Sequence, residues 1–195
     1  MLKLLVVVSV LISTLWIVRQ IFVNVELREL AGDLDRARSA VQTYRDRFGY
    51  LPGDDVNTGS RWGAVVPNGD GDGMISGVWL DRDVHDDNLE PETRLLWLHL
   101  RRARMWSGPI EGPMALALPA NAAGGYIGVQ SANFGMDGVV VCVSGLDMAQ
   151  ASALDTQLDD GRPASGYVRA AKEANHTVGA SLYTPNTDYY LCRAL

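Results

Sequence analysis

The stretch VNVELRELAGDLDRARSAVQTYRDRF, Val23–Phe48, decides the fold, because its apolar residues recur in alternating steps of four and three. On a helix, this spacing places the apolar residues in one stripe and leaves the charged residues on the other faces. The stretch therefore predicts an amphipathic helix that packs along one face. The stripe consists of Val23, Leu27, Leu30, Leu34, Ala37, Val41, Tyr44 and Phe48.

The segment before the stripe is apolar on every face. LLVVVSVLISTLWIV, Leu4–Val18, carries no charge, and its extension to Val23 reaches the length of about 20 residues that a membrane helix needs. We therefore expect residues 1–23 to span a membrane. Lys3 precedes the run, which favours a cytoplasmic N-terminus and an exported remainder. A buried core helix and a cleaved signal peptide are the alternatives, and RQIFVNVE offers no small-residue cleavage site.

The two segments are expected to form one helix. No proline interrupts Met1–Leu51, and Gly49 and Pro52 follow the stripe as stop signals. We thus divide the chain into a membrane half, residues 1–23, an amphipathic half, residues 24–49, and a loop-rich head, residues 50–195.

The head has an α+β pattern. A long loop from Pro52 precedes a helix in EPETRLLWLHLRRARMW, with Pro91 in its first turn and Gly108 after its end. Strands are expected in GGYIGVQ, DGVVVCV, SGYVRA and DYYLCRA, with a short helix capped by Asp147 between the second and the third. This order indicates an antiparallel sheet packed on the long N-terminal helix.

The long loop contains NGDGDGMISG, Asn68–Gly77, which resembles half of a calcium loop. Alternating oxygen ligands and a glycine fit that pattern, but Trp79 stands where the closing glutamate belongs. A carboxylate from elsewhere must close the site, with Asp54 or Glu90 as first candidates and Asp55 or Glu92 as others. A Gly/Asp turn that binds no metal explains the stretch equally well. The expected Ca²⁺ ligands are Asn68, Asp70, Asp72, the Met74 carbonyl, Glu90 and Asp54.

Other chemistry has weaker support. Asp155, Asp159 and Asp160 could form a second acidic site, although a helix end running into a turn explains them better. His85, His99 and His176 are scattered, and we expect His99 to be a packed helix residue. No GxSxG, HExxH, P-loop or GxGxxG motif occurs, so we expect no enzyme. The net charge of −6 disfavours nucleic-acid binding.

The two cysteines, Cys142 and Cys192, both fall in predicted strands. A disulfide is the natural expectation if the head is exported, and two buried thiols are expected if it is cytoplasmic.

The chain from Ala40 to Cys192 resembles the type IV pilins and type II secretion pseudopilins. The resemblance is carried, in order, by YRDRFGYLPGDDVN, RWG followed by NGDGDGMI, RLLWLHLRRA, GVVVCV and ALDTQLDDGRPASGYVRA. It implies a structural subunit of a pilus or pseudopilus that assembles with itself or with other pilin-like subunits on an inner-membrane assembly platform. Some secretion pseudopilins bind calcium in a loop of the head.

The resemblance also implies a location: a single-pass bacterial inner-membrane protein with its head in the periplasm or in an extracellular fibre. The family's leader, cleavage site and early glutamate have no match, since no Glu precedes Glu26 and no Gly precedes Gly32. Cleavage, N-methylation and glutamate docking are therefore assigned to no residue. The alternative is a signal-anchored periplasmic module that binds Ca²⁺ or a partner and does not polymerise.

Overall fold

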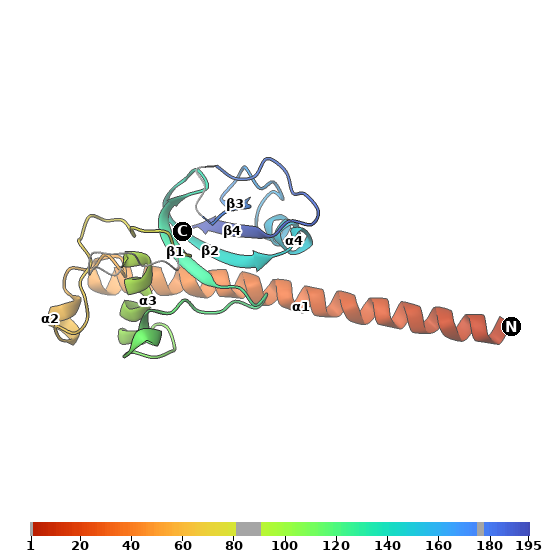
Figure 1. The fold of residues 1–195 in the computed structure, drawn as a ribbon, viewed down its shortest axis with the longest axis horizontal. Coiled ribbons are helices and arrows are strands. Elements are labelled where there is room, and N and C mark those ends of the chain that lie inside the picture. Colours follow the sequence, from red (N-terminus) through yellow and green to blue (C-terminus); the bar gives the residue numbers. More distant parts are fainter. Residues whose placement is uncertain (1, 81–90, 175–177) are drawn as a thin grey trace.

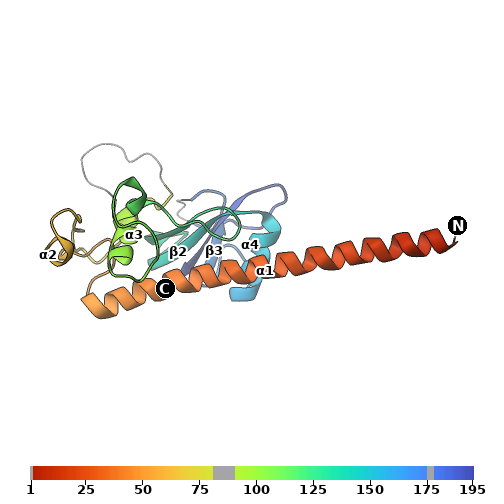
Figure 2. The same ribbon diagram turned by 90° about the horizontal axis from the view of Figure 1, so that it is seen from below.

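The computed structural model describes residues 2–80, 91–174 and 178–195. The described chain has an α+β fold with an antiparallel sheet and an N-terminal helix, which confirms the predicted class. Figures 1 and 2 show the head on one side of the C-terminal part of this helix. The elements are α1 (Leu2–Phe48), α2 (Thr58–Trp62), α3 (Glu92–Arg102), η1 (Pro113–Leu116), β1 (Ile127–Asn133), β2 (Met136–Leu146), α4 (Met148–Leu158), β3 (Val168–Ala171) and β4 (Tyr189–Ala194).

The amphipathic stripe of α1 forms the centre of the hydrophobic core. Leu30, Leu34, Val41 and Tyr44 are fully buried, packed in one cluster with side chains of the sheet, α3 and α4. The helix ends at Phe48, and the amide of Gly49 donates to the Arg45 carbonyl. Gly49 has a φ of 79°, a conformation that glycine adopts without strain.

The sheet has the strand order β1-β2-β4-β3, and every neighbouring pair is antiparallel. Successive residues of β2 point to opposite faces. Val141 and Val143 join the core that contains α1, whereas Val140 and Cys142 belong to a second cluster around Trp79. Trp79 thus covers the face of the sheet that α1 does not.

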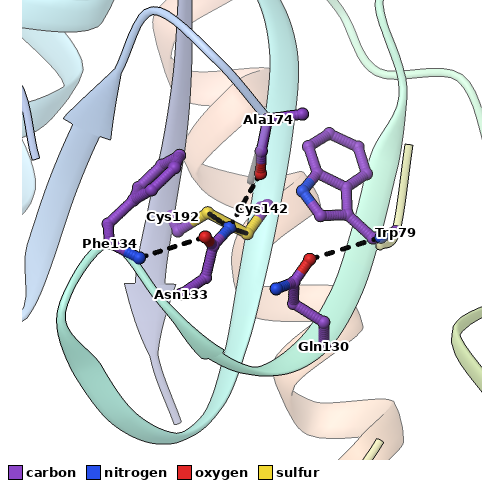
Figure 3. The surroundings of a disulfide bond; sticks show 7 residues. All are labelled: Trp79, Gln130, Asn133, Phe134, Cys142, Ala174 and Cys192. Atoms are coloured by element: carbon purple, nitrogen blue, oxygen red, sulfur yellow. Dashed lines mark hydrogen bonds between the residues drawn. A yellow bond between two sulfur atoms is a disulfide. The ribbon is translucent and has the colours of Figure 1, made fainter. Parts of the chain in front are cut away.

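Gly128 makes the packing of Trp79 possible. A Cβ at position 128 would lie 1.9 Å from the Trp79 ring, so no larger residue fits there. The Trp79 amide also donates to the Gln130 side chain at 3.2 Å (Figure 3). The end of the long loop is therefore fixed to β1.

Cys142 and Cys192 are joined by a disulfide between β2 and β4 (Figure 3). The two residues are direct partners in the ladder, with Cα atoms 4.0 Å apart. The Asn133 amide group donates to Cys192 Sγ and to the Ala174 carbonyl beside it. The disulfide is fully buried.

The helices of the head follow the sequence signals in part. Asp147 caps α4 as predicted, and it forms a reciprocal capping box with Gln150. α3 begins after Pro91 but ends at Arg102, earlier than the expected stop near Gly108. α2 and η1 lie within segments for which the sequence predicted no helix.

The predicted localisation is wrong. Within residues 2–80, 91–174 and 178–195, no helix combines the length and the apolar character that crossing a membrane requires. A membrane span needs both properties at once. The assignment of residues 1–23 to a single-pass inner-membrane anchor, with a cytoplasmic N-terminus and a periplasmic head, is therefore not supported.

Candidate metal centre

Three segments of the head converge after the end of α1. The Gly69 amide donates to the Asp55 carbonyl at 3.1 Å, and the Thr93 amide donates to the Ser76 carbonyl at 3.3 Å. These bonds tie the NGDGDGMISG loop to the segment after α1 on one side and to the start of α3 on the other. Acidic side chains from all three segments are thereby brought to one place.

Four carboxylates meet at this point. Asp54, Asp70, Asp72 and Glu92 each offer one oxygen, and these oxygens all lie within 4.8 Å of one another. Oxygens on opposite sides of a Ca²⁺ ion lie about 5 Å apart, since each bond is about 2.3–2.6 Å. The four groups could therefore hold a metal ion without a large rearrangement. We call this set the carboxylate cluster.

The two exposed carboxylates belong to consecutive turns of the loop. Asp70 Oδ1 accepts from the Asp72 amide at 3.0 Å, and Asp72 Oδ1 accepts from the Met74 amide at 2.7 Å. Each side chain thus folds back on its own backbone and keeps its Oδ2 for another partner. This geometry explains the alternation of Asp and Gly in the sequence.

The two buried carboxylates come from outside the loop and hold its backbone. Glu92 accepts from the Asp70 amide at 3.1 Å and from the Ser76 amide at 2.9 Å. Asp54 Oδ2 accepts from the Gly73 amide at 3.1 Å, whereas Asp54 Oδ1 is buried without a partner among the described atoms. Only 2% of Asp54 is exposed, and no described donor meets this oxygen in hydrogen-bond geometry.

The cluster is electrostatically unfavourable without a cation. Burial raises the pKa of Asp54, the Gly73 and Gly71 amides oppose this, and the charges of Asp72 and Asp70 raise it further. Burial likewise raises the pKa of Glu92. Hydrogen bonds from the Ser76 and Asp70 amides lower this pKa, and the charges of Asp70 and Asp54 raise it further. A bound cation would favour the ionised forms of both groups.

Glycine allows the segments to approach this closely. A Cβ at position 69 would lie 2.2 Å from the Gly53 carbonyl oxygen and 2.4 Å from the Asp54 Cα. Gly53 has a φ of 94°, and a Cβ there would lie 2.5 Å from the Glu92 carbonyl oxygen. Both contacts involve backbone atoms, which side-chain movement cannot relieve.

The predicted ligands differ in where the structure places them. Asp54, Asp70 and Asp72 lie in the carboxylate cluster, and Glu92, one of the alternatives to Glu90, joins them. Glu90 lies outside the described residues. Met74, whose carbonyl is the predicted ligand atom, lies two residues after Asp72 and donates its amide to Asp72 Oδ1.

Asn68, another predicted ligand, makes hydrogen bonds with α2. Its Oδ1 accepts from the Thr58 hydroxyl and from the Gly59 amide, both at 2.8 Å. The side chain therefore bonds the loop to α2, an element that no motif in the sequence predicts.

Asp55, another candidate ligand, lies next to Asp54 in sequence but bonds residues outside the carboxylate cluster. Its Oδ2 accepts from the Tyr44 hydroxyl at 2.7 Å and from Arg61 Nη1 at 2.6 Å. Burial alone would raise the pKa of Asp55, but the bonds from Arg61 and Tyr44 outweigh burial and lower it. Asp55 is thus a buried anion that links α1 to α2.

The second acidic group has donors of its own. Asp155 accepts from the Tyr183 hydroxyl at 2.7 Å and from the Gly161 amide at 3.2 Å. Asp159 accepts from the amides of Tyr167 and Val168, and Asp160 accepts from the Arg162 amide and the Ser165 hydroxyl. Although one oxygen of each lies within 4.8 Å of the others, the hydrogen bonds account for this group as the end of α4.

No family model, curated protein or solved structure matches the chain.

Proposed function

We propose that the chain is a structural subunit of a fibre of the type IV pilus or type II secretion pseudopilus kind, assembled with copies of itself or with other pilin-like subunits. The observation that carries the proposal is the asymmetry of α1. Its amphipathic half is buried against the sheet, whereas its N-terminal part extends beyond the head as a continuous helix (Figures 1 and 2).

The extended part of α1 carries the apolar sequence Leu4–Val18. A helix that is apolar on every face is stable in water only when other groups cover it. The head lies beside the other half of α1 and leaves this part uncovered (Figure 1). Equivalent helices from neighbouring subunits would supply the cover by packing ridges into grooves. A fibre with a helical core and outward heads is the arrangement that these features favour.

Assembly can be tested with two chains. The full chain should form large ordered particles in sedimentation and electron microscopy, whereas a chain beginning at Asn24 should remain a folded monomer. A Val8→Arg substitution should prevent assembly and leave the circular dichroism of the head unchanged. A full chain that remains monomeric at all concentrations would contradict the proposal and favour a module that does not polymerise.

We further infer that the carboxylate cluster takes Ca²⁺. All of its ligands are oxygens, which suits a hard cation, and Ca²⁺ accepts six to eight of them in flexible geometry. The unpartnered Asp54 Oδ1 is the observation that favours a cation over a plain turn, because burying a carboxylate oxygen without any partner is costly. Asp70 and Asp72 are exposed, which leaves one side open for water ligands.

Calorimetric titration with calcium, and with magnesium as a comparison, tests this inference. The wild type should bind one calcium ion, and its melting temperature should rise with calcium and fall with chelator. An Asp70→Ala, Asp72→Ala variant should lose both effects, while Asp137→Ala, an exposed aspartate of β2 outside the cluster, should keep them. Equal melting temperatures of the wild type with and without calcium would leave the loop as a turn.

A further inference from the structure

A pocket with chemistry unlike that of the carboxylate cluster lies at the C-terminal end of α1. Arg47, Arg61, Arg102 and Arg104 line it together with the rings of Phe48 and Trp62, and no acidic residue is among its described lining residues. Its volume of about 780 Å³ falls in the range of small-molecule sites. We call it the arginine pocket. None of its described lining residues belongs to the carboxylate cluster.

The surroundings of the pocket do not balance its charge. Arg61 is paired with Asp55, and Arg102 lies 3.9 Å from Glu111, whose side chain is 82% exposed. The C-termini of α1 and α3 together add about one negative charge from their dipoles. The four arginines carry four positive charges. Asp55, Glu111 counted as a full charge, and the two helix dipoles together offset about three of them, so about one positive charge remains. Neither Arg47 nor Arg104 pairs with an acidic residue within the described chain.

Arg104 occupies a position that favours glycine. It follows the C-cap of α3, its amide donates to the Arg101 carbonyl, and the Met105 amide donates to the Leu100 carbonyl. This is the pattern of a Schellman motif, in which the residue at position 104 must be left-handed. The φ of Arg104 is 61°. A charged, strained residue thus stands in the wall of the pocket, at a place where glycine would fold more easily.

Two of the guanidinium groups pack on the ring of Phe48 in the pocket. The Arg61 guanidinium carbon lies 4.2 Å from the Phe48 ring centroid, and that of Arg47 lies 5.1 Å from it. Guanidinium groups that pack on a ring lose less freedom when their N–H groups bind a planar or tetrahedral anion. The pocket therefore has partly ordered donors as well as excess charge.

We propose that the arginine pocket binds a small ligand through its oxyanion group, a carboxylate or a phosphate. Forked pairing with arginine suits both groups, since each presents two oxygens to one guanidinium. Arg47 and Arg104 supply the unpaired charge, while Arg61 and Arg102 fix the walls.

Calorimetric titration of the full chain with pyrophosphate and with citrate tests the proposal, in calcium-free buffer because both probes chelate calcium. Saturable binding of at least one probe is expected. An Arg47→Gln, Arg104→Gly double variant should bind at least tenfold more weakly. The glycine removes the strain at position 104, so this variant should melt no lower than the wild type.

Arg45→Gln is the matched control, because Arg45 is an exposed arginine of the same helical turn that does not line the pocket. Its affinity should stay within twofold of the wild type. Tighter binding of pyrophosphate would indicate a phosphate-bearing ligand, and tighter binding of citrate a carboxylate-bearing one. Absence of binding for both probes, or equal weakening in the Arg45→Gln and pocket variants, would overturn the proposal.

Discussion

The imidazole of His99 accepts a hydrogen bond at Nδ1 from the amide of Gly53, with the two nitrogens 2.9 Å apart. On its other side, Nε2 donates to the Pro67 carbonyl at 2.9 Å, which fixes the neutral tautomer with the proton on Nε2. Gly53 precedes Asp54 and Pro67 precedes the Asp/Gly loop. The fully buried ring therefore fixes the distance between the two segments that carry Asp54 and the Asp/Gly loop of the carboxylate cluster.

This role of His99 predicts a loss of stability in acid. Burial lowers the pKa of His99 from 6.5 to about 4, so between these values the unfolded chain binds a proton that the folded chain does not. Stability contributed by the neutral ring is complete above pH 6.5 and declines as the pH falls toward 4, by about 3 kcal/mol at most. Denaturant unfolding of wild type and His99→Gln in chelator, at pH 7 and pH 4.5, should show a gap that narrows in acid. A constant gap would exclude His99 as the source.

The carboxylate cluster predicts opposite effects of one substitution in two buffers. Asp54→Asn removes a buried charge and places an amide donor among the remaining carboxylates, so in chelator it should stabilise the head by about 1 kcal/mol. With calcium it should melt below the wild type, because a carboxylate ligand is lost. Thermal melts in both buffers check whether the order of the two melting temperatures reverses. Asp137→Asn, the surface control, should shift both melts alike.

The cluster also predicts a pH dependence of the calcium-free fold. The raised pKa values of Asp54 and Glu92 mean that the folded state holds protons which the unfolded state releases above pH of about 4. Without calcium, these two groups should therefore destabilise the head as the pH rises from 4 upward. Calcium should abolish this trend. The same trend in the Asp54→Asn, Glu92→Gln variant would assign it to other groups.

The close contact at Gly69 predicts an order of costs among the loop glycines. Gly69→Ala places a Cβ against the Gly53 and Asp54 backbone and should cost about 2–3 kcal/mol. Gly73→Ala meets no atom within 4 Å but must adopt a φ of 85°, which should cost about 1–2 kcal/mol. Urea unfolding measures both values. An equal or smaller cost for Gly69→Ala would mean that the backbone segments can separate.

The disulfide predicts a large stability difference on reduction. Its cysteines are 50 residues apart in sequence, and a loop of this length corresponds to about 4 kcal/mol in the chain-entropy model. A Cys142→Ala, Cys192→Ala variant should lose about that amount in denaturant unfolding, and reductant should destabilise the wild type only. Reductant that destabilises both proteins equally would contradict the assignment.

Periodic and capping signals predicted the parts of the fold that depend on local sequence. The stripe of α1 and the Asp147 cap of α4 each need only nearby residues, and both are present in the structure. The sequence alone did not single out Asp54 and Glu92 as the carboxylates that complete the cluster. Their position depends on where the tertiary fold places the residues before and after the long loop. Spacing indicated that a distant carboxylate was needed, but Glu92 and Glu90 were indistinguishable by spacing.

Other features have no local signal. Asn68 fits a calcium-loop pattern by type and position, yet α2 offers it two donors, and these bonds exist only once Thr58 and Gly59 are in place. Arg104 breaks the rule by which glycine marks a helix end, so α3 was predicted to continue beyond Arg102. The arginines of the pocket come from distant segments, and only the tertiary fold reveals their proximity.

The position of β4 in the sheet bears on the order in which the head can be completed. β4 is the last of the described strands in sequence, yet it lies between β2 and β3, and β3 pairs with no other described strand. During synthesis, β3 therefore emerges from the ribosome before its neighbour exists. The sheet closes only when Tyr189–Ala194 have followed, and loss of these few residues would leave β3 without a described strand to pair with.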